Sequence, residues 1–463
     1  MTVTGTAAPP VMTGSGNGER TGRRADGAGT GDEVTSGVLL GCEAPRPECV
    51  RSTRRARPAL DTEVPALVVK VGSYPQHHGG LGVIRTLGRV GVPVYAMTER
   101  GLTPAAASRY LAGRFGYRSD RTGEEELLAR LLEIGREIGR PTVAVPTDDE
   151  AGVLLAEHAA ELSEHFLLPP VAPSLPRRLA SKGELSRICA EHGIPAPRCG
   201  VPRCVDELHA LVAELGYPLV LKNLEPFTRL RRPVVGATAV VRDEAELLAH
   251  CPPGAWDRDT APSVLVQEYL PSEHAQDWVT HLCCGPGGEP LVVFTGLKLR
   301  SWPPGAGVTT RARALPDPGL AELAVRLCRA IGYCGVADLD WRLDLRTGRY
   351  NLLDFNPRTG AQFRLFETAD GVDVVRALHL SLTGRAVPAG PQLLRSYGVG
   401  QLDAVSAGAW AWRHRALPRD LAPRRSTERA WLCRDDPVPA AVELGWFGTT
   451  VADRLRRAVH RRG

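Results

Sequence analysis

Two acidic segments carry the clearest chemistry in this sequence. Five polar residues recur along them with a spacing of two residues: Asp338 and Asp340 in the first segment, and Asp354, Asn356 and Arg358 in the second. Between the segments, Arg346-Thr-Gly348 predicts a three-residue hairpin loop closed by Leu345 and Arg349. In that register Asp340 faces Asp354, and Asp338 faces Asn356. Because side chains alternate between the two faces of a strand, these four lie on one face.

Two carboxylates held opposite each other repel, and a cation relieves that repulsion. Two carboxylates and one amide offer only oxygen ligands, which suit Mg²⁺ because it prefers octahedral oxygen coordination and keeps positions for phosphate oxygens. We therefore predict a Mg²⁺ site, with Mn²⁺ as a substitute, on Asp340, Asp354 and Asn356. Arg358 would face the same site and stabilise charge on a transferring phosphoryl group. The alternative is a solvated hairpin whose acids pair with neighbouring arginines.

Lysine is rare in this chain. The 57 lysine and arginine residues include only four lysines: Lys70, Lys182, Lys222 and Lys298. Arginine supplies positive charge elsewhere, so each lysine needs a reason of its own. The compact, mobile ammonium of lysine can follow a phosphate through a reaction, for which a planar guanidinium is not equivalent. Three of the four lysines therefore suit a phosphoryl-transfer site; chance placement is the competing explanation.

Composition limits the class of protein. A chain of 463 residues predicts two or three domains, and 43% hydrophobic with 24% charged residues is a soluble, globular balance. No apolar stretch approaches a bilayer span or a signal-peptide core, so we expect a cytoplasmic protein without an integral membrane segment. The eleven cysteines form no Cys-x-x-Cys pair and indicate reduced thiols. A net charge of +5 without a recognisable module argues against nucleic acid.

The pattern of elements predicts an α/β and α+β multidomain chain. Residues 1–62 show no hydrophobic rhythm, which indicates a disordered extension. Residues 63–172 alternate strands and helices, including a helix at 124–138, which predicts a small doubly wound domain. Residues 173–385 form a mixed, largely antiparallel region with hairpins, typical of an α+β domain. Residues 386–463 form an extension rich in Arg and Trp, whose basic, helix-like end is either solvated or faces an anionic surface.

The acidic hairpin resembles the metal-binding hairpin of ATP-grasp ligases, with Asp in both acidic positions where Glu is commoner. Other segments follow in that family's order. Ala180–Leu185 and Tyr217–Lys222 resemble the segments whose lysines contact ATP phosphates. Val264–Pro271 resembles the hinge strand between two lobes, where adenine is bound, and Thr295–Arg300 resembles the strand that brings a basic residue to the γ-phosphate. The likeness covers about 65 to 385.

The resemblance implies an ATP-grasp fold with its hinge near 264–271, preceded by a small doubly wound pre-ATP-grasp domain. It implies an ATP-dependent ligase that activates a carboxylate as an acyl phosphate and joins it to an amine, releasing ADP and phosphate. The implied substrates are small molecules, amino acids or peptides, and a homodimer is left open. The implied site residues are Lys298, Arg300 and Arg358 for catalysis, Lys182, Lys222, Gln267, Glu268, Leu270 and Glu273 for ATP, and Asp340, Asp354 and Asn356 for Mg²⁺. Asp277 competes with Glu273 as the ribose-binding acid.

Three loops are candidate contacts. Glu225–Pro233 follows Lys222 but lacks the glycines that would let backbone N–H groups wrap the phosphates. Either Thr228 and the arginines substitute for them, or the loop becomes ordered only on binding. Gly72–Gly80 lies between a strand and a helix, where α/β domains bind ligands, and its two histidines either contact substrate or are exposed. Ser301–Thr310 forms either a lid over the acyl phosphate or an ordinary surface loop.

Two other functions remain open. A carboxylase-like enzyme would use bicarbonate as the carboxylate, although nothing in the chain resembles a biotin-carrier Met-Lys-Met segment. A non-catalytic ATP-binding regulator would not need Asp340, Asp354, Asn356 and Arg358 together.

Overall fold

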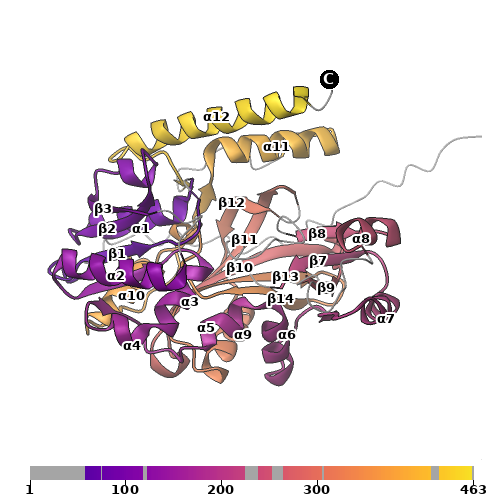
Figure 1. The fold of residues 1–463 in the computed structure, drawn as a ribbon, viewed down its shortest axis with the longest axis horizontal. Helices are drawn as coiled ribbons and strands as arrows, with labels where there is room; N and C mark the ends of the chain where they lie inside the picture. The colour runs from indigo at the N-terminus through magenta and orange to yellow at the C-terminus, as the bar shows by residue number, and fades with distance from the viewer. Residues whose placement is uncertain are drawn as a thin grey trace, which may run out of the picture. The chain divides into compact units, whose positions relative to one another are not determined.

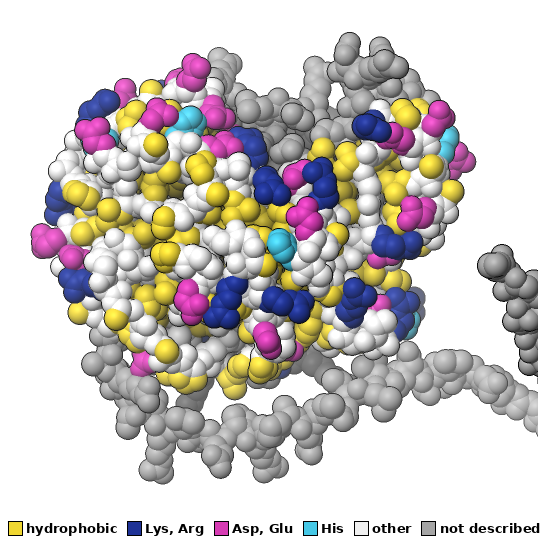
Figure 2. Space-filling model, turned by 90° about the horizontal axis from the view of Figure 1, so that it is seen from below, with side chains coloured by type: hydrophobic (Ala, Val, Ile, Leu, Met, Phe, Trp, Pro, Cys, Tyr) yellow, Lys and Arg dark blue, Asp and Glu magenta, His cyan; other side chains and the backbone are white. Residues whose placement is uncertain are grey.

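The computed structural model describes residues 58–74, 76–117, 123–224, 238–252, 264–304, 307–418 and 427–460. These residues belong to one compact unit and form three sheets, of five, four and seven strands. No helix in this part of the chain is long and apolar enough to cross a bilayer. Figure 2 shows acidic and basic side chains interspersed on one face of the molecule, as expected for a mild net charge. The extension predicted at 1–62 lies outside the described residues, apart from its last five.

The parallel sheet comes first in the described chain, with strand order β3-β2-β1-β4-β5. Figure 1 labels its strands β1, β2 and β3. Its strands are β1 (Ala66–Val69), β2 (Val94–Glu99), β3 (Leu111–Tyr117), β4 (Thr142–Pro146) and β5 (Phe166–Leu167). Its helices are α1 (His78–Gly88), α2 (Glu124–Ile138), α3 (Asp149–Glu157) and α4 (Ala159–Leu162), with a 3₁₀ turn η1 (Ala105–Ala107). The predicted doubly wound arrangement is present, including the helix at 124–138.

Strand β3 was not predicted. Its sequence, Leu-Ala-Gly-Arg-Phe-Gly-Tyr, contains two glycines, which weaken a strand pattern because they bring no side chain to pack. The strand lies at the edge of the sheet, so its residues alternate between partly buried and exposed positions instead of forming an apolar run.

The small sheet is antiparallel and has strand order β6-β9-β7-β8. Its strands are β6 (Cys199–Gly200), β7 (Leu219–Asn223), β8 (Thr238–Val241) and β9 (Val264–Glu268). The helices in this region are α5 (Leu175–Ala180), α6 (Lys182–Glu191), α7 (Val205–Leu215) and α8 (Glu244–His250). Apolar residues of α7, α8 and the strands share one buried cluster, which fixes β7 and its lysine.

The large sheet has strand order β14-β13-β10-β11-β12-β15-β16 and is antiparallel except for the β15–β16 pair. Its strands are β10 (Ala275–Cys284), β11 (Pro290–Trp302), β12 (Val308–Ala314), β13 (Gly335–Asp344), β14 (Arg349–Asn356), β15 (Ser396–Gly398) and β16 (Thr427–Arg429). With it lie α9 (Pro318–Ala330), α10 (Val374–Leu382), α11 (Gly400–His414), α12 (Val438–His460) and the 3₁₀ turns η3 (Ser272–His274), η4 (Pro286–Gly288) and η5 (Phe363–Leu365). The segment predicted as a C-terminal extension thus adds two strands to this sheet.

Helices α1 and α10 join the parallel sheet to the large sheet. Ile84 of α1 and Leu378 of α10 belong to one buried apolar cluster that also contains Val68 of β1 and Val279 of β10. Since this core is shared, the strand ends of the two sheets are held in a fixed relation to each other.

Arg85 of α1 anchors the C-terminal segment. Its buried guanidinium donates to the backbone oxygens of Ala430, Trp431 and Asp436 at 3.1, 2.9 and 2.8 Å, and to the Asp436 carboxylate at 2.9 Å. Burying a guanidinium is tolerated here because every contact is a charge-assisted hydrogen bond.

Glu443 of α12 forms a second anchor. Its carboxylate accepts from Gln76 at 3.1 Å and from Gln401 of α11, so it ties both C-terminal helices to the loop that precedes α1. The side chain is buried, and burial raises the pKa of Glu443 to about 7.

The raised pKa makes stability depend on pH. A glutamate whose pKa in the folded protein exceeds its ordinary value of 4.5 stabilises the fold fully below pH 4.5. That contribution to the free energy of unfolding is lost as pH rises towards about 7. The wild type should therefore lose free energy of unfolding as pH rises from 5 to 8, whereas Glu443→Gln should not. Over this interval we expect the stability of the variant, measured by urea unfolding, to rise by about 1–3 kcal/mol relative to that of the wild type. Glu125→Gln on the exposed face of α2 controls for the loss of one charge, and an equal effect of both variants would contradict the assignment to Glu443.

Candidate active site

Strands β13 and β14 bring the predicted acids together. Asp340 pairs with Asp354, and Asp338 pairs with Asn356, as the sequence predicted. The backbone of Asp338 also accepts a hydrogen bond from the Asn356 amide nitrogen at 2.9 Å. The two strands therefore present opposed carboxylates with an amide alongside.

The turn of this hairpin differs from the prediction. Asp344 pairs with Arg349, so the turn spans 345–348, one residue more than predicted, and Gly348 adopts the expected positive φ of 69°. A β-bulge then absorbs the extra residue Leu353, which restores the predicted pairing of the acids. The closure predicted at Leu345 was wrong, because a uniform register leaves no room for a bulge.

Three lysines converge on the opposed carboxylates. Lys182, the first residue of α6, lies 2.5 Å from Asp354 Oδ1, and Lys222 of β7 lies 3.4 Å from the same oxygen. Lys298 of β11 forms an ion pair with Asp340. The lysines come from helix α6 and from one strand each of the small and large sheets, so the fold as a whole assembles this cluster.

The bulge contributes to the cluster directly. Leu353, the residue left without a cross-strand partner, offers its carbonyl oxygen to Lys222 Nζ at 3.2 Å. A backbone group freed from the ladder thus fixes the position of a lysine.

The two carboxylates differ in charge balance. Burial opposes ionisation of Asp354, but Lys182 and Lys222 outweigh it and lower the pKa of Asp354 to about 2. Burial also raises the pKa of Asp340, where the neighbouring carboxylates add to the shift and Lys298 only partly offsets it. Asp340 is therefore the acid that a further cation would stabilise most.

These residues fit a divalent metal ion. Asp340 and Asp354 supply opposed oxygens, and the amide oxygen of Asn356 is the atom available for coordination because its nitrogen donates to the backbone. In the described part of the chain, no group of three or more His, Cys, Asp or Glu forms an alternative metal site.

Arg358 is held between two acids. Its Nη1 lies 2.6 Å from Asp338 Oδ2, and its Nε lies 3.4 Å from Asp149 Oδ1. Asp338 Oδ1 in turn lies 3.1 Å from Nε2 of the buried His281. Burial lowers the pKa of Arg358, but Asp149 and Asp338 outweigh it, so the net shift is upward. Asp149 was not predicted; its place directly after the parallel strand β4 is the signal that could have identified it.

The parallel sheet forms one wall of the site through the turn between β4 and α3. Thr359 donates its backbone N–H to the Pro146 oxygen at 3.0 Å. A Cβ added to Gly152 of α3 would lie only 2.3 Å from the Pro357 oxygen. Glycine is required there because α3 and the segment that follows β14 approach so closely.

The predicted hinge residues lie on β9 and just after it. Gln267 is buried, and Glu268 accepts from the backbone N–H and from Nε of Arg198, both at 2.9 Å. The hinge strand thus lies in the middle of the small sheet, between β6 and β7.

The two candidate ribose acids have different surroundings. Asp277 is in a bidentate ion pair with Arg342 at 2.7 and 3.0 Å, and Arg342 also donates to the Leu270 oxygen at 3.0 Å. Glu273 lies exposed in η3. Asp277 is therefore already engaged, whereas Glu273 faces solvent.

Arg300 does not join the lysines in this structure. Its guanidinium forms a bidentate ion pair with Asp403 of α11, with distances of 2.9 and 3.0 Å from Nη2 to the two carboxylate oxygens. A role beside Lys298 would require Arg300 to leave this pair.

The candidate loops are only partly described. Glu225–Pro233 lies outside the described residues, as do residues 305 and 306 of Ser301–Thr310, whose Thr309 and Thr310 are buried in β12. Both histidines of the loop before α1 are buried. His77 accepts from the Gly80 N–H at the start of α1, and His78 Nδ1 lies 2.9 Å from the Tyr397 hydroxyl. Of the two alternatives for these histidines, substrate contact or an exposed loop position, the exposed position is therefore wrong for both.

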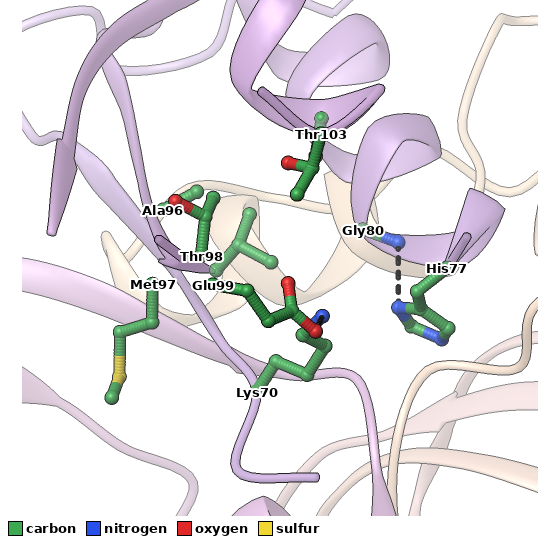
Figure 3. Close-up of a pocket in the computed structure, with 10 residues that line it drawn as sticks. Lys70, His77, Gly80, Ala96, Met97, Thr98, Glu99 and Thr103 are labelled. Atoms are coloured by element: carbon green, nitrogen blue, oxygen red, sulfur yellow. Dashed lines mark hydrogen bonds and ion pairs between the residues drawn. The ribbon is translucent and has the colours of Figure 1, made fainter. Parts of the chain in front are cut away.

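The fourth lysine lines a small pocket at the ends of β1 and β2 (Figure 3). Lys70 Nζ lies 2.6 Å from Glu99 Oε1 and donates to the Tyr74 oxygen at 2.9 Å. This buried ion pair accounts for the lysine that the phosphoryl-transfer interpretation left out.

The sequence is similar to that of a known ligase. The chain is 23% identical to D-aspartate ligase from Enterococcus faecium (strain Aus0004) over 299 residues, which are 62% of this chain and 69% of that protein. No protein-family model matches the sequence.

Two solved structures share the fold. N5-carboxyaminoimidazole synthetase from Staphylococcus aureus, complexed with ADP, superposes with a TM-score of 0.54 at 10% identity over 78% of this chain and 88% of that chain. The biotin carboxylase domain of Hydrogenobacter thermophilus 2-oxoglutarate carboxylase, in complex with MgADP, ADP and bicarbonate, gives a TM-score of 0.51 at 17% identity over 70% of both chains.

The close approach of α3 to Pro357 can be tested at Gly152. We expect Gly152→Ala to lower the free energy of unfolding by about 1–3 kcal/mol, because the new methyl group meets backbone rather than a movable side chain. Gly408→Ala in α11, where no atom lies within 4 Å of the added Cβ, should leave stability unchanged or raise it by up to about 1 kcal/mol. Urea unfolding of both variants measures the difference; equal stability would mean that the contact is not tight.

Proposed function

We propose that this chain, an ATP-grasp ligase, uses ATP to join the carboxylate of an amino acid or peptide to an amine, releasing ADP and phosphate. The observation that carries the proposal is the convergence of Lys182, Lys222 and Lys298 on the opposed Asp340 and Asp354. A non-catalytic nucleotide sensor has no need of this cluster together with Arg358.

The reaction proceeds in two displacements. An oxygen of the substrate carboxylate bonds to the γ-phosphorus of ATP as the bond to ADP breaks, which gives an acyl phosphate. The amine nitrogen then bonds to the acyl carbon, and phosphate leaves with the electron pair of the broken C–O bond. The protein contributes mainly positioning and electrostatic stabilisation to both steps.

The lysines serve the first displacement by exchanging partners. Each is paired with a carboxylate, so an arriving triphosphate replaces one negative partner by another without leaving a buried ammonium uncompensated. Mg²⁺, held by Asp340, Asp354 and Asn356, would offset the phosphate charge. Arg358, fixed by Asp338, stabilises the charge that develops on the transferring phosphoryl group.

The hinge supplies the nucleoside contacts. Gln267, Glu268 and Leu270 lie along β9 and its end, where backbone groups bind adenine in this fold. We assign the ribose hydroxyls to Glu273, because Asp277 is engaged by Arg342.

The related D-aspartate ligase supports an amino acid as one substrate. The biotin carboxylase neighbour, at 17% identity, supports the fold rather than the use of bicarbonate. Bicarbonate therefore belongs in the assay as the competing carboxylate.

The proposal is tested by Mg²⁺-dependent phosphate release from ATP, with pooled amino acids as acid and amine and with bicarbonate in a separate reaction. We expect Asp354→Asn to lower turnover by at least about 100-fold, because the metal site and the partner of two lysines are lost together. Mass spectrometry of the products should show the mass of acid plus amine less water.

Asp344→Asn, an acid on the same hairpin that pairs with Arg346 near the turn, is the matched control and should keep wild-type turnover. Undiminished turnover by Asp354→Asn would refute the site. Product formation with bicarbonate alone would indicate a carboxylase-like enzyme. ATP binding without turnover in every pool would indicate a non-catalytic regulator.

A further inference from the structure

Asp149 is a carboxylate at the site to which no role has yet been assigned. It begins α3, directly after the parallel strand β4 and its loop, and its Oδ1 lies 3.4 Å from Arg358 Nε. That oxygen is buried and makes no hydrogen bond with any described residue. The side chain as a whole keeps 23% of its surface exposed through atoms other than Oδ1, so a ligand can reach the carboxylate from that side.

Asp338 is the nearer and more deeply buried of the two acids that contact Arg358. Its side chain is only 5% exposed, and it accepts from Arg358 at 2.6 Å while His281 lies 3.1 Å away. Arg358 is therefore already held in place from its own sheet. The contact to Asp149 is longer, although the Asp149 charge also helps to raise the pKa of Arg358.

Several charged side chains of the cluster are partly exposed. Their exposed fractions fall in a narrow range: Lys182 15%, Lys298 18%, Arg358 18%, Asp149 23%, Asp354 24% and Asp340 28%. Asp149 is also electrostatically close to its neighbours. Burial lowers the pKa of Lys182, but Asp354 and, after it, Asp149 reverse the shift.

The second displacement poses a problem that this cluster alone does not solve. Three lysines and Arg358 attract phosphates and a carboxylate, but they repel the ammonium form of an amine. Asp340 and Asp354 are engaged by lysines and by the proposed metal, and Asp338 is engaged by Arg358. Asp149 is the remaining carboxylate in contact with Arg358, and its Oδ1, although ion-paired with Arg358, accepts no hydrogen bond from any described residue.

We propose that Asp149 receives the acceptor amine, holding its ammonium group and taking one proton from it before attack. This role rests on the proposed function. The neutral nitrogen then forms the N–C bond as the acyl C–O bond breaks, and the departing phosphate takes the second proton. Asp149 returns its proton to solvent, so charge and atoms balance over RNH₃⁺ and acyl phosphate giving amide, HPO₄²⁻ and H⁺.

The two half-reactions separate this role from a structural one. Hydroxylamine is a neutral nucleophile that traps an acyl phosphate as a hydroxamate without needing a protein carboxylate. We expect Asp149→Asn to form hydroxamate and ADP within about threefold of wild type, while amide formation with the amine falls by about 100-fold or more. KM for the amine should rise, with KM for ATP and for the acid unchanged.

Asp206→Asn, which removes an exposed acid from the first turn of α7, is the matched control and should change neither half-reaction. Asp149→Glu should recover part of the amide formation, because it restores a carboxylate. Thermal unfolding of each variant verifies that the fold is intact.

Loss of hydroxamate and amide together in Asp149→Asn would overturn the proposal and make Asp149 a positioning residue for Arg358. Unchanged amide formation would overturn it as well. If the wild type forms no hydroxamate with any pooled acid, the proposed function itself fails, and the role of Asp149 fails with it.

Discussion

The repulsion between Asp340 and Asp354 is the constraint on which the rest of the site depends. Two carboxylates facing each other across a hairpin are stable only if positive charge reaches both, and the structure delivers it from three elements at once. Lys222 lies on β7 of the small sheet, Lys182 begins helix α6, and Lys298 lies on β11 of the large sheet. Any substrate with concentrated negative charge can then replace the carboxylates as partner of the same lysines. The energetic cost of placing two acids together is thus offset by the three lysines.

The three sheets divide the work among them. The small sheet carries the predicted hinge strand and Lys222, and the large sheet carries the acidic hairpin. The parallel sheet contributes the turn that touches Pro357 and Thr359, so it forms part of the site rather than a separate appendage. The apolar cluster around α1 and α10 makes this arrangement rigid, because residues of both larger sheets pack within it. The position of Arg358 therefore depends on apolar packing away from the charged cluster.

The sequence predicted those features that depend on local periodicity. The facing of Asp340 and Asp354 follows from a spacing of two on two strands, and the scarcity of lysine identified the three that converge there. Leu353 escaped prediction because a bulge changes the register without changing the hydrophobic pattern. Asp149 and the Arg300–Asp403 pair escaped because each depends on contact between segments that are distant in the chain. Periodicity indicates which face a side chain occupies, but not which remote element will meet it.

The order of synthesis gives the buried Arg85 a further consequence. The five strands of the parallel sheet are complete once Leu167 has been made, but the groups that accept hydrogen bonds from Arg85 lie between Ala430 and Asp436. During translation, the Arg85 side of α1 therefore lacks its hydrogen-bond acceptors while more than half of the chain is still being synthesised. Such a nascent chain exposes apolar surface and an unpaired guanidinium for a long interval, which favours protection by a chaperone over unaided folding.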